Sequence, residues 1–397
     1  MQWTRPSHTF SFWLSPPKTA TTTLQEGFKQ VKNQLLSGDN IYYCAGGNVC
    51  GKIAHLISSC GLKPNYTESL ECWDQTRRTL NGLPRPKNDT HVLLSSEPMS
   101  IGNGWQHHLK RHAPIDWLSV KEQLGKDWRV VIIVGYRRYV DWLPSSDQQI
   151  WRWTPSKPRM NKWPDKGGRV FTPLLPTRWK KAVKPGAYTY THTSLLLEGI
   201  NGTLPVVLFN MHDLRDLDLS NLAINNNSTL LSHRKVSLLS RFLCKNLKEA
   251  GIETNSTCIH SLRTDIATTG HKVANPSQTL FYDALGVAAW KKQLVSSNMR
   301  RHTVALSIER FHTEQLNQTH HDLPVTCPSK NEYEEFLEFS ITTEATTVPE
   351  FSNTAMGRQS HIESFWKSVA KQKYCWIDTD KILEREEWKQ FFQTNFA

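Results

Sequence analysis

The run Trp128-Arg129-Val130-Val131-Ile132-Ile133-Val134 constrains the fold more than any other segment. Its uninterrupted β-branched residues suit a strand that is buried on both faces, as central strands of parallel sheets are. Further short β-like runs alternate with helical patterns along the chain. We expect strands at residues 10–14, 40–45, 91–95, 128–134 and 205–210, and helices at 22–36, 115–124, 236–250, 279–295, 362–370 and 378–392. This alternation predicts an α/β fold with a central parallel β-sheet flanked by helices.

Two polar segments interrupt this pattern, and we interpret the chain as a single domain over residues 1–397 with surface insertions. Residues 151–185 are rich in Lys and Arg, contain one acidic residue (Asp165) and carry four interleaved tryptophans. Residues 296–360 are polar and poorly patterned, which makes them a second candidate insertion. The net charge of +12 (48 basic, 36 acidic residues) favours anionic partners.

A tight polar turn, Pro17-Lys18-Thr19-Ala20-Thr21-Thr22-Thr23-Leu24, lies between the first expected strand and the first expected helix. Unpaired N–H groups at a helix start bind anions, and a lysine with several hydroxyls adds further donors. The pattern G-x-x-x-x-G-K-[ST] of ATP-binding loops is absent, because no glycine lies between Pro16 and Glu26. The turn therefore predicts a phosphate site of another kind, with a threonine-rich helix cap as the alternative.

The order of residues in this turn resembles the 5′-phosphosulfate loop of sulfotransferases, whose usual form is Pro-Lys-[Ser/Thr]-Gly-Thr-Thr. Ala20 stands where glycine is usual. The resemblance implies a P-loop nucleotide-hydrolase-like topology and the cosubstrate 3′-phosphoadenosine 5′-phosphosulfate (PAPS). It assigns the 5′ side of the cofactor to Pro17, Lys18, Thr19, Ala20, Thr21, Thr22 and Thr23.

A second motif, an arginine followed by a serine, also resembles the cofactor site of this family. In the family, an arginine at the end of a later strand and a serine eight residues on bind the 3′-phosphate of PAPS. Arg137 and Ser145 have this spacing after the run at 128–134, and Arg138 with Ser146 has it too. We favour Arg137 with Ser145, although Pro144 is unusual there. A guanidinium and a hydroxyl suit a phosphate monoester, whereas an arginine pair that merely caps a strand is the alternative.

The resemblance also implies the roles that sulfuryl transfer requires. Lys18 is expected to neutralise the leaving phosphate, and a base must take the proton of the acceptor. Glu97 follows the expected strand at 91–95, where ligands of open α/β sheets bind, and is the first candidate for this base. The second set is His107, His108 and His112. The reaction requires no metal, and we expect none.

The acceptor is expected to be a carbohydrate, with an anionic polysaccharide as one candidate. Tryptophans 151, 153, 163 and 179 can stack on sugar faces while Lys and Arg pair with sulfate or carboxylate groups, although a solvated loop is the alternative. A non-catalytic binder of anionic polysaccharides and a divergent P-loop nucleotide kinase remain alternative functions. A nucleic-acid-binding protein is a third alternative, suggested by charge alone, but the chain lacks a helix-turn-helix, zinc-finger or RNP signature and we expect no nucleic-acid partner. No apolar run is long enough for an integral membrane segment.

The compartment is indicated by opposing signals. The cytosolic family's C-terminal Arg-Lys-Gly signature is absent, so the resemblance is to the Golgi, carbohydrate-type enzymes. Eight cysteines form an even set in which local disulfides are feasible. Asn-x-Ser/Thr sequons, which matter only in secreted chains, begin at Asn65, Asn88, Asn201, Asn226, Asn227, Asn255 and Asn317. Residues 1–14 lack a convincing signal peptide. We expect the Golgi lumen or secretory pathway, with the cytoplasm as the alternative.

Overall fold

The computed structural model describes residues 8–14, 21–45, 47–60, 66–83, 90–95, 115–142, 163, 193–200, 202–212, 237–263, 276–319, 322–352, 354–372 and 374–396. The chain forms two compact units. The first comprises Met1–Trp142, Ala182–Gly270 and Ser340–Arg358, and the second comprises Leu143–Lys181, His271–Phe339 and Gln359–Ala397. Each unit combines separate segments of the chain. The expected single domain with two insertions stays a prediction.

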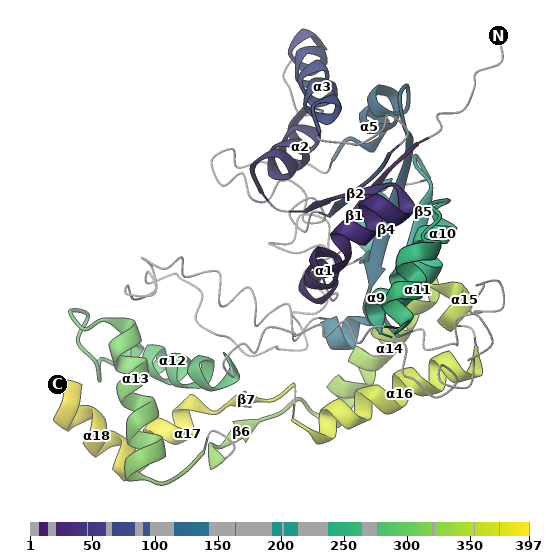
Figure 1. The fold of residues 1–397 in the computed structure, drawn as a ribbon. Helices are drawn as coiled ribbons and strands as arrows, with labels where there is room; N and C mark the ends of the chain where they lie inside the picture. The colour runs from purple at the N-terminus through teal and green to yellow at the C-terminus, as the bar shows by residue number, and fades with distance from the viewer. Residues whose placement is uncertain are drawn as a thin grey trace, which may run out of the picture. The chain divides into compact units, whose positions relative to one another are not determined.

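The first unit contains a five-stranded sheet with β1 at its centre (Figure 1). Its strands are β1 (Thr9–Leu14), β2 (Ile41–Ala45), β3 (His91–Ser95), β4 (Arg129–Tyr136) and β5 (Val206–Asn210). Their order is β2-β3-β1-β4-β5, and each neighbouring pair is parallel. The expected α/β class with a central parallel sheet flanked by helices is therefore confirmed.

Side chains of the central strands alternate between two separate apolar cores. Phe10, Phe12 and Leu14 of β1 belong to one core, whereas Trp13 belongs to the other. The first core is completed by α2 (Gly47–Cys60), α3 (Tyr66–Asn81), α5 (Trp117–Leu124) and α8 (Thr193–Ile200). The second is completed by α1 (Thr21–Asp39), α9 (Leu238–Arg241), η3 (Phe242–Asn246) and α10 (Leu247–Glu249). Burial on both faces is the reason why β4 reads as a continuous apolar run.

Helix α1 connects the centre of the sheet to its edge. Leu24, Phe28, Val31 and Leu35 recur at helical spacing and are all buried against the second core. At the end of this helix, the Asp39 carboxylate accepts hydrogen bonds from the backbone N–H groups of Ser256 (2.9 Å) and Thr257 (2.8 Å). It also accepts from the Thr257 hydroxyl, which is fully buried. Asp39 therefore caps α11 (Asn255–Arg263) from a distant part of the chain.

We expect Asp39→Ala to lower the free energy of unfolding by about 2 kcal/mol, because a cap is lost and a buried hydroxyl loses its acceptor. Denaturant titration measures this loss. Asp116→Ala is the matched control, since Asp116 is an exposed N-cap whose carboxylate accepts from Ser119 N (3.1 Å) within its own helix. The control should lose about 1 kcal/mol. Equal losses in the two variants would contradict the role of Asp39 in tying α1 to α11.

The second unit is mainly helical. It contains α12 (Pro276–Lys291), α13 (Arg301–Arg310), η4 (Phe311–Gln315), α17 (Thr379–Leu383), α18 (Glu386–Phe396) and the antiparallel pair β6 (Val325–Thr326) and β7 (Trp376–Ile377). The division between the units falls within α14 (Lys330–Thr347) and α16 (Ala355–Ala370), with α15 (Pro349–Ser352) between them. The polar stretch at 296–360 is thus largely helical. Its periodicity was hidden because buried positions of α14 include Ser340, Thr343, Glu344 and Thr347.

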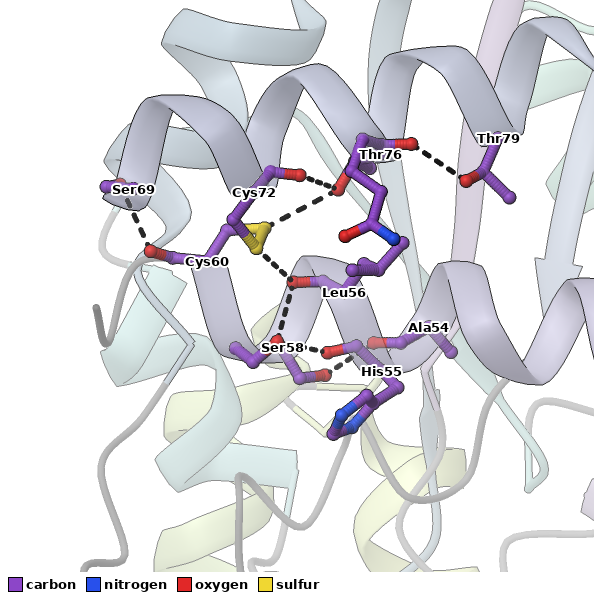
Figure 2. Close-up of a disulfide and its surroundings, with 11 residues drawn as sticks. Ala54, His55, Leu56, Ser58, Cys60, Ser69, Cys72, Thr76 and Thr79 are labelled. Carbon is purple, nitrogen blue, oxygen red and sulfur yellow. Dashed lines mark hydrogen bonds between the residues drawn. A yellow bond between two sulfur atoms is a disulfide. The ribbon is translucent and has the colours of Figure 1, made fainter. Parts of the chain in front are cut away.

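All eight cysteines lie in described segments and form four disulfides. The pairs are Cys44–Cys50, Cys60–Cys72, Cys244–Cys258 and Cys327–Cys375. Figure 2 shows the second pair, which joins the end of α2 to α3. Ser69 Oγ donates to the Cys60 carbonyl (3.1 Å) and Thr76 Oγ1 donates to the Cys72 carbonyl (2.9 Å) beside it. Three of these pairs are the local disulfides that the cysteine spacing permitted, whereas the pairing of Cys327 with Cys375 had no signal in the sequence.

Candidate functional site

The candidate site lies where the parallel strands end. Leu14, the last residue of β1, pairs with Val134 of β4, and Trp13 pairs with Ser95 of β3. The segments that follow β1, β3 and β4 therefore leave the sheet at the same edge, and β1 lies between β3 and β4. In open α/β sheets, ligands bind at the carboxyl ends of the strands. Three of the predicted site segments thus start from adjacent strands.

Most of the predicted site residues lie outside the described residues. These are Pro17, Lys18, Thr19, Ala20, Glu97, Ser145 and the histidines His107, His108 and His112. The backbone of Thr21, Thr22 and Thr23 is described and forms the first turn of α1. Their N–H groups thus occupy the helix terminus that the anion-site hypothesis requires.

Arg137 follows β4 directly, and its side chain is half-buried. The guanidinium of its neighbour Arg138 is hydrogen-bonded to other parts of the first unit. The Arg138 Nε donates to Glu344 Oε1 (3.0 Å), and the two side chains are 1% and 2% exposed. Arg138 Nη2 also donates to the Gly357 carbonyl (3.2 Å). Because Arg138 is almost completely buried whereas Arg137 is half-buried, Arg138 is a poorer candidate for a ligand contact than Arg137.

A polar cluster that the sequence did not reveal surrounds the ends of β4 and β5. His212 Nε2 accepts a hydrogen bond from the Arg138 backbone N–H (3.1 Å) and lies 3.8 Å from Asp141 Oδ2. The His212 backbone N–H in turn donates to Asn210 Oδ1 (3.0 Å). These bonds hold the turn after β4 against β5. Because the partners follow separate strands, no local sequence motif predicts these contacts.

Burial, followed by the negative charge of Glu344, raises the pKa of the Tyr136 hydroxyl well above its ordinary value. Tyr136 therefore stays protonated at neutral pH and cannot act as the general base.

Helix α14 also supports the turn after β4 through Ser340 Oγ, which accepts a hydrogen bond from the Val140 N–H (3.3 Å). Glu344 and Ser340 are thus two residues of α14 that hold the backbone of the turn beginning at Arg137.

On the other side of β1, a second contact joins α1 to the end of β3. Gln25 Nε2 donates to Ser95 Oγ (2.9 Å), and Ser95 is the last residue of β3. Burial raises the pKa of the nearby Tyr43 hydroxyl above its usual value, so this tyrosine also remains protonated. The start of α1 and the strand that leads to Glu97 are therefore held together by a side-chain bond.

The basic, tryptophan-rich segment at 151–185 is described only at Trp163. This ring stacks on Trp290 of α12 (centroids 5.4 Å apart, interplanar angle 2°), and its Nε1 donates to the Met299 carbonyl (2.9 Å). Trp163 therefore packs within the second unit, and one face of its ring is already covered. The sugar-binding role of Trp151, Trp153 and Trp179 stays a prediction.

Within the described ranges, no three His, Cys, Asp or Glu side chains are grouped so that they could hold a metal ion. No helix in those ranges is both long and apolar enough to cross a membrane. The fold defines an α/β protein with a five-stranded parallel sheet, and the anion site at the carboxyl ends of its strands stays a prediction. Comparisons with protein-family models, curated proteins and solved structures give no match for this chain.

Proposed function

We propose that this protein is a sulfotransferase that moves a sulfuryl group from PAPS to a hydroxyl or amine of a carbohydrate-type acceptor. The observation that carries the proposal is the pairing of β1 with β4 at the centre of the parallel sheet. The Lys18 turn follows one of these strands and Arg137 follows the other. A nucleotide that is phosphorylated at both ends needs two anion sites, and segments that follow neighbouring strands start close together.

The proposed reaction divides its tasks among these segments. The N–H groups at the start of α1 and the threonines of the turn bind the 5′-phosphate, and Lys18 stabilises the negative charge on the leaving phosphate. Arg137 with Ser145 binds the 3′-phosphate. Glu97, or one of His107, His108 and His112, removes the acceptor proton as the acceptor oxygen or nitrogen attacks sulfur. No metal is needed for these steps, and the acceptor is bound by the basic segment at 151–185.

The proposal is tested by calorimetry with 3′-phosphoadenosine 5′-phosphate, ATP and AMP. We expect the 3′-phosphorylated nucleotide to bind most tightly and Arg137→Ala to weaken it at least tenfold, or about 1.4 kcal/mol, because the guanidinium contact is lost. Arg129→Ala is the matched control, since Arg129 is an exposed residue at the opposite end of the same strand. It should leave the affinity unchanged.

Two outcomes would redirect the proposal. Equal affinity for ATP and the 3′-phosphorylated nucleotide would favour the nucleotide kinase. Binding of an anionic polysaccharide without any nucleotide binding would favour the non-catalytic carbohydrate-binding protein.

A further inference from the structure

Every cysteine of this chain is engaged in an intrachain disulfide, and all eight lie in the described segments. Cys44, Cys60 and Cys258 are almost completely buried, so their bridges are part of the folded interior. Disulfides of this kind form in the oxidising lumen of the secretory pathway and are rare in the cytosol. The same lumen is where asparagine-linked oligosaccharides are attached to Asn-x-Ser/Thr.

Two sequons lie wholly within the described residues, and the structure treats them differently. Asn317 lies in the irregular segment between η4 and β6, and its side chain is exposed. Its φ of 50° is in the left-handed region, which asparagine tolerates better than most residues. Thr319, the hydroxyl residue of this sequon, is exposed as well. Asn317 and Thr319, the two residues that define the sequon, are therefore displayed at the surface, while Gln318 between them is half-buried.

The surroundings of Asn317 hold this turn in place without covering it. Asp322 Oδ2 accepts hydrogen bonds from the Thr319 N–H (2.7 Å) and from Thr319 Oγ1 (2.9 Å). The Gln318 N–H donates to the His312 carbonyl (3.1 Å). These contacts come from residues 312–322, and the Thr319 hydroxyl that the transferase must recognise is bonded to the neighbouring Asp322 rather than to a distant part of the chain.

The second sequon, at Asn255, is presented in another way. Asn255 is exposed, but it begins α11, and Thr257 is fully buried with both its N–H and its hydroxyl on Asp39. The next residue, Cys258, forms the disulfide with Cys244. Once this part of the chain has folded, the hydroxyl of the sequon is inaccessible. Asn255 can therefore accept a glycan only before the disulfide closes.

We propose that Asn317 is an N-glycosylation site of this protein and that Asn255 is modified only in a minority of molecules. In the reaction, Asn317 Nδ2 forms a bond to the anomeric carbon of an oligosaccharide carried on a lipid pyrophosphate. The bond between that carbon and the pyrophosphate oxygen breaks, the lipid pyrophosphate leaves, and Nδ2 loses one proton. This inference does not depend on the proposed sulfuryl transfer.

The test is expression of the full chain behind a secretion leader in eukaryotic cells, with recovery from the secretory compartment and the medium. Peptide N-glycosidase in heavy-oxygen water converts each glycan-bearing asparagine to a labelled aspartate, and mass spectrometry of the peptides gives the occupancy at each position. We expect label at Asn317 in most molecules and at Asn255 in few. Disulfide-bonded protein with an unlabelled Asn317 would overturn the proposal.

Two variants and one change of conditions sharpen the test. Asn317→Asp removes the acceptor amide and keeps a residue that tolerates positive φ, so folded protein lacking one glycan is expected. Thr319→Ser keeps the sequon and should keep the glycan. Synthesis in the presence of a membrane-permeable thiol should raise the occupancy of Asn255, because Cys244 and Cys258 stay reduced. Equal occupancy at Asn255 and Asn317 without the thiol would contradict the proposal that folding makes the sequon at Asn255 inaccessible.

Discussion

Glu344→Gln is expected to lower the free energy of unfolding by about 3–5 kcal/mol, because it leaves the Arg138 guanidinium buried without a counter-charge. The two side chains are 1% and 2% exposed, and the Nε–Oε1 distance is 3.0 Å. Water cannot replace the lost carboxylate at such a position. Denaturant unfolding of the two proteins measures the difference directly.

Glu334→Gln provides a matched control on the same helix. Glu334 faces Lys330 at 3.7 Å, and both side chains are largely exposed, so this pair should contribute less than about 1 kcal/mol. A double variant, Arg138→Met with Glu344→Leu, should be more stable than Glu344→Gln, because it removes both buried charges. A loss in Glu344→Gln no larger than that in the control would show that the buried pair is not what holds the turn after β4.

Lys18→Ala is expected to lower the rate of sulfuryl transfer by about 100- to 1,000-fold, as loss of a single group that stabilises developing charge does in other enzymes. The measurement is transfer of labelled sulfate from PAPS to chemically desulfated glycosaminoglycans. The affinity for 3′-phosphoadenosine 5′-phosphate should fall far less than the rate, because in the proposed site the helix N-terminus and Arg137 remain to bind the two phosphates.

The control for this variant is Lys32→Ala. Lys32 is an exposed residue of α1, the helix that begins after the Lys18 turn, and its loss should leave the rate unchanged. Retention of the full transfer rate in Lys18→Ala would mean that the turn does not stabilise the leaving group. A fall in nucleotide affinity as large as the fall in rate would assign Lys18 to ground-state binding instead.

The strands of the sheet could be predicted from the sequence because their burial leaves a local signature. The strand at 91–95 was expected with the bounds that it has, and the others were within two residues at each end. Helices α2, α3, α8, α11, α13, α14 and α15 were missed. In α2 the pattern is short and interrupted by glycine and serine, and in α3 charged residues are frequent. Such helices are stabilised by packing and by disulfides, which a local pattern does not record.

The candidate site divides in the same way. Arg137 could be singled out because it follows a recognisable strand, but its distinction from Arg138 depended on Glu344, which lies far along the chain. His212 and Asp141 could not be connected with the site beforehand, since their contacts join separate strands and turns. The stacking of Trp163 on Trp290 could not be foreseen either, and it covers one face of the ring that was expected to bind a sugar.

By itself, the sequence determined the parallel α/β class, the positions of its strands and the order in which the turn at Lys18 and Arg137 occur. These properties depend on the periodicity of apolar side chains and on short spacings, which are local. Only the tertiary structure decided that β1 lies between β3 and β4, that Arg138 is neutralised by Glu344, and that the sequon at Asn255 is closed by Asp39 while that at Asn317 stays exposed. The strand order, the Arg138–Glu344 pair and the burial of Thr257 against Asp39 each depend on which distant residues are brought into contact, whereas the contacts of the turn at Asn317 are local.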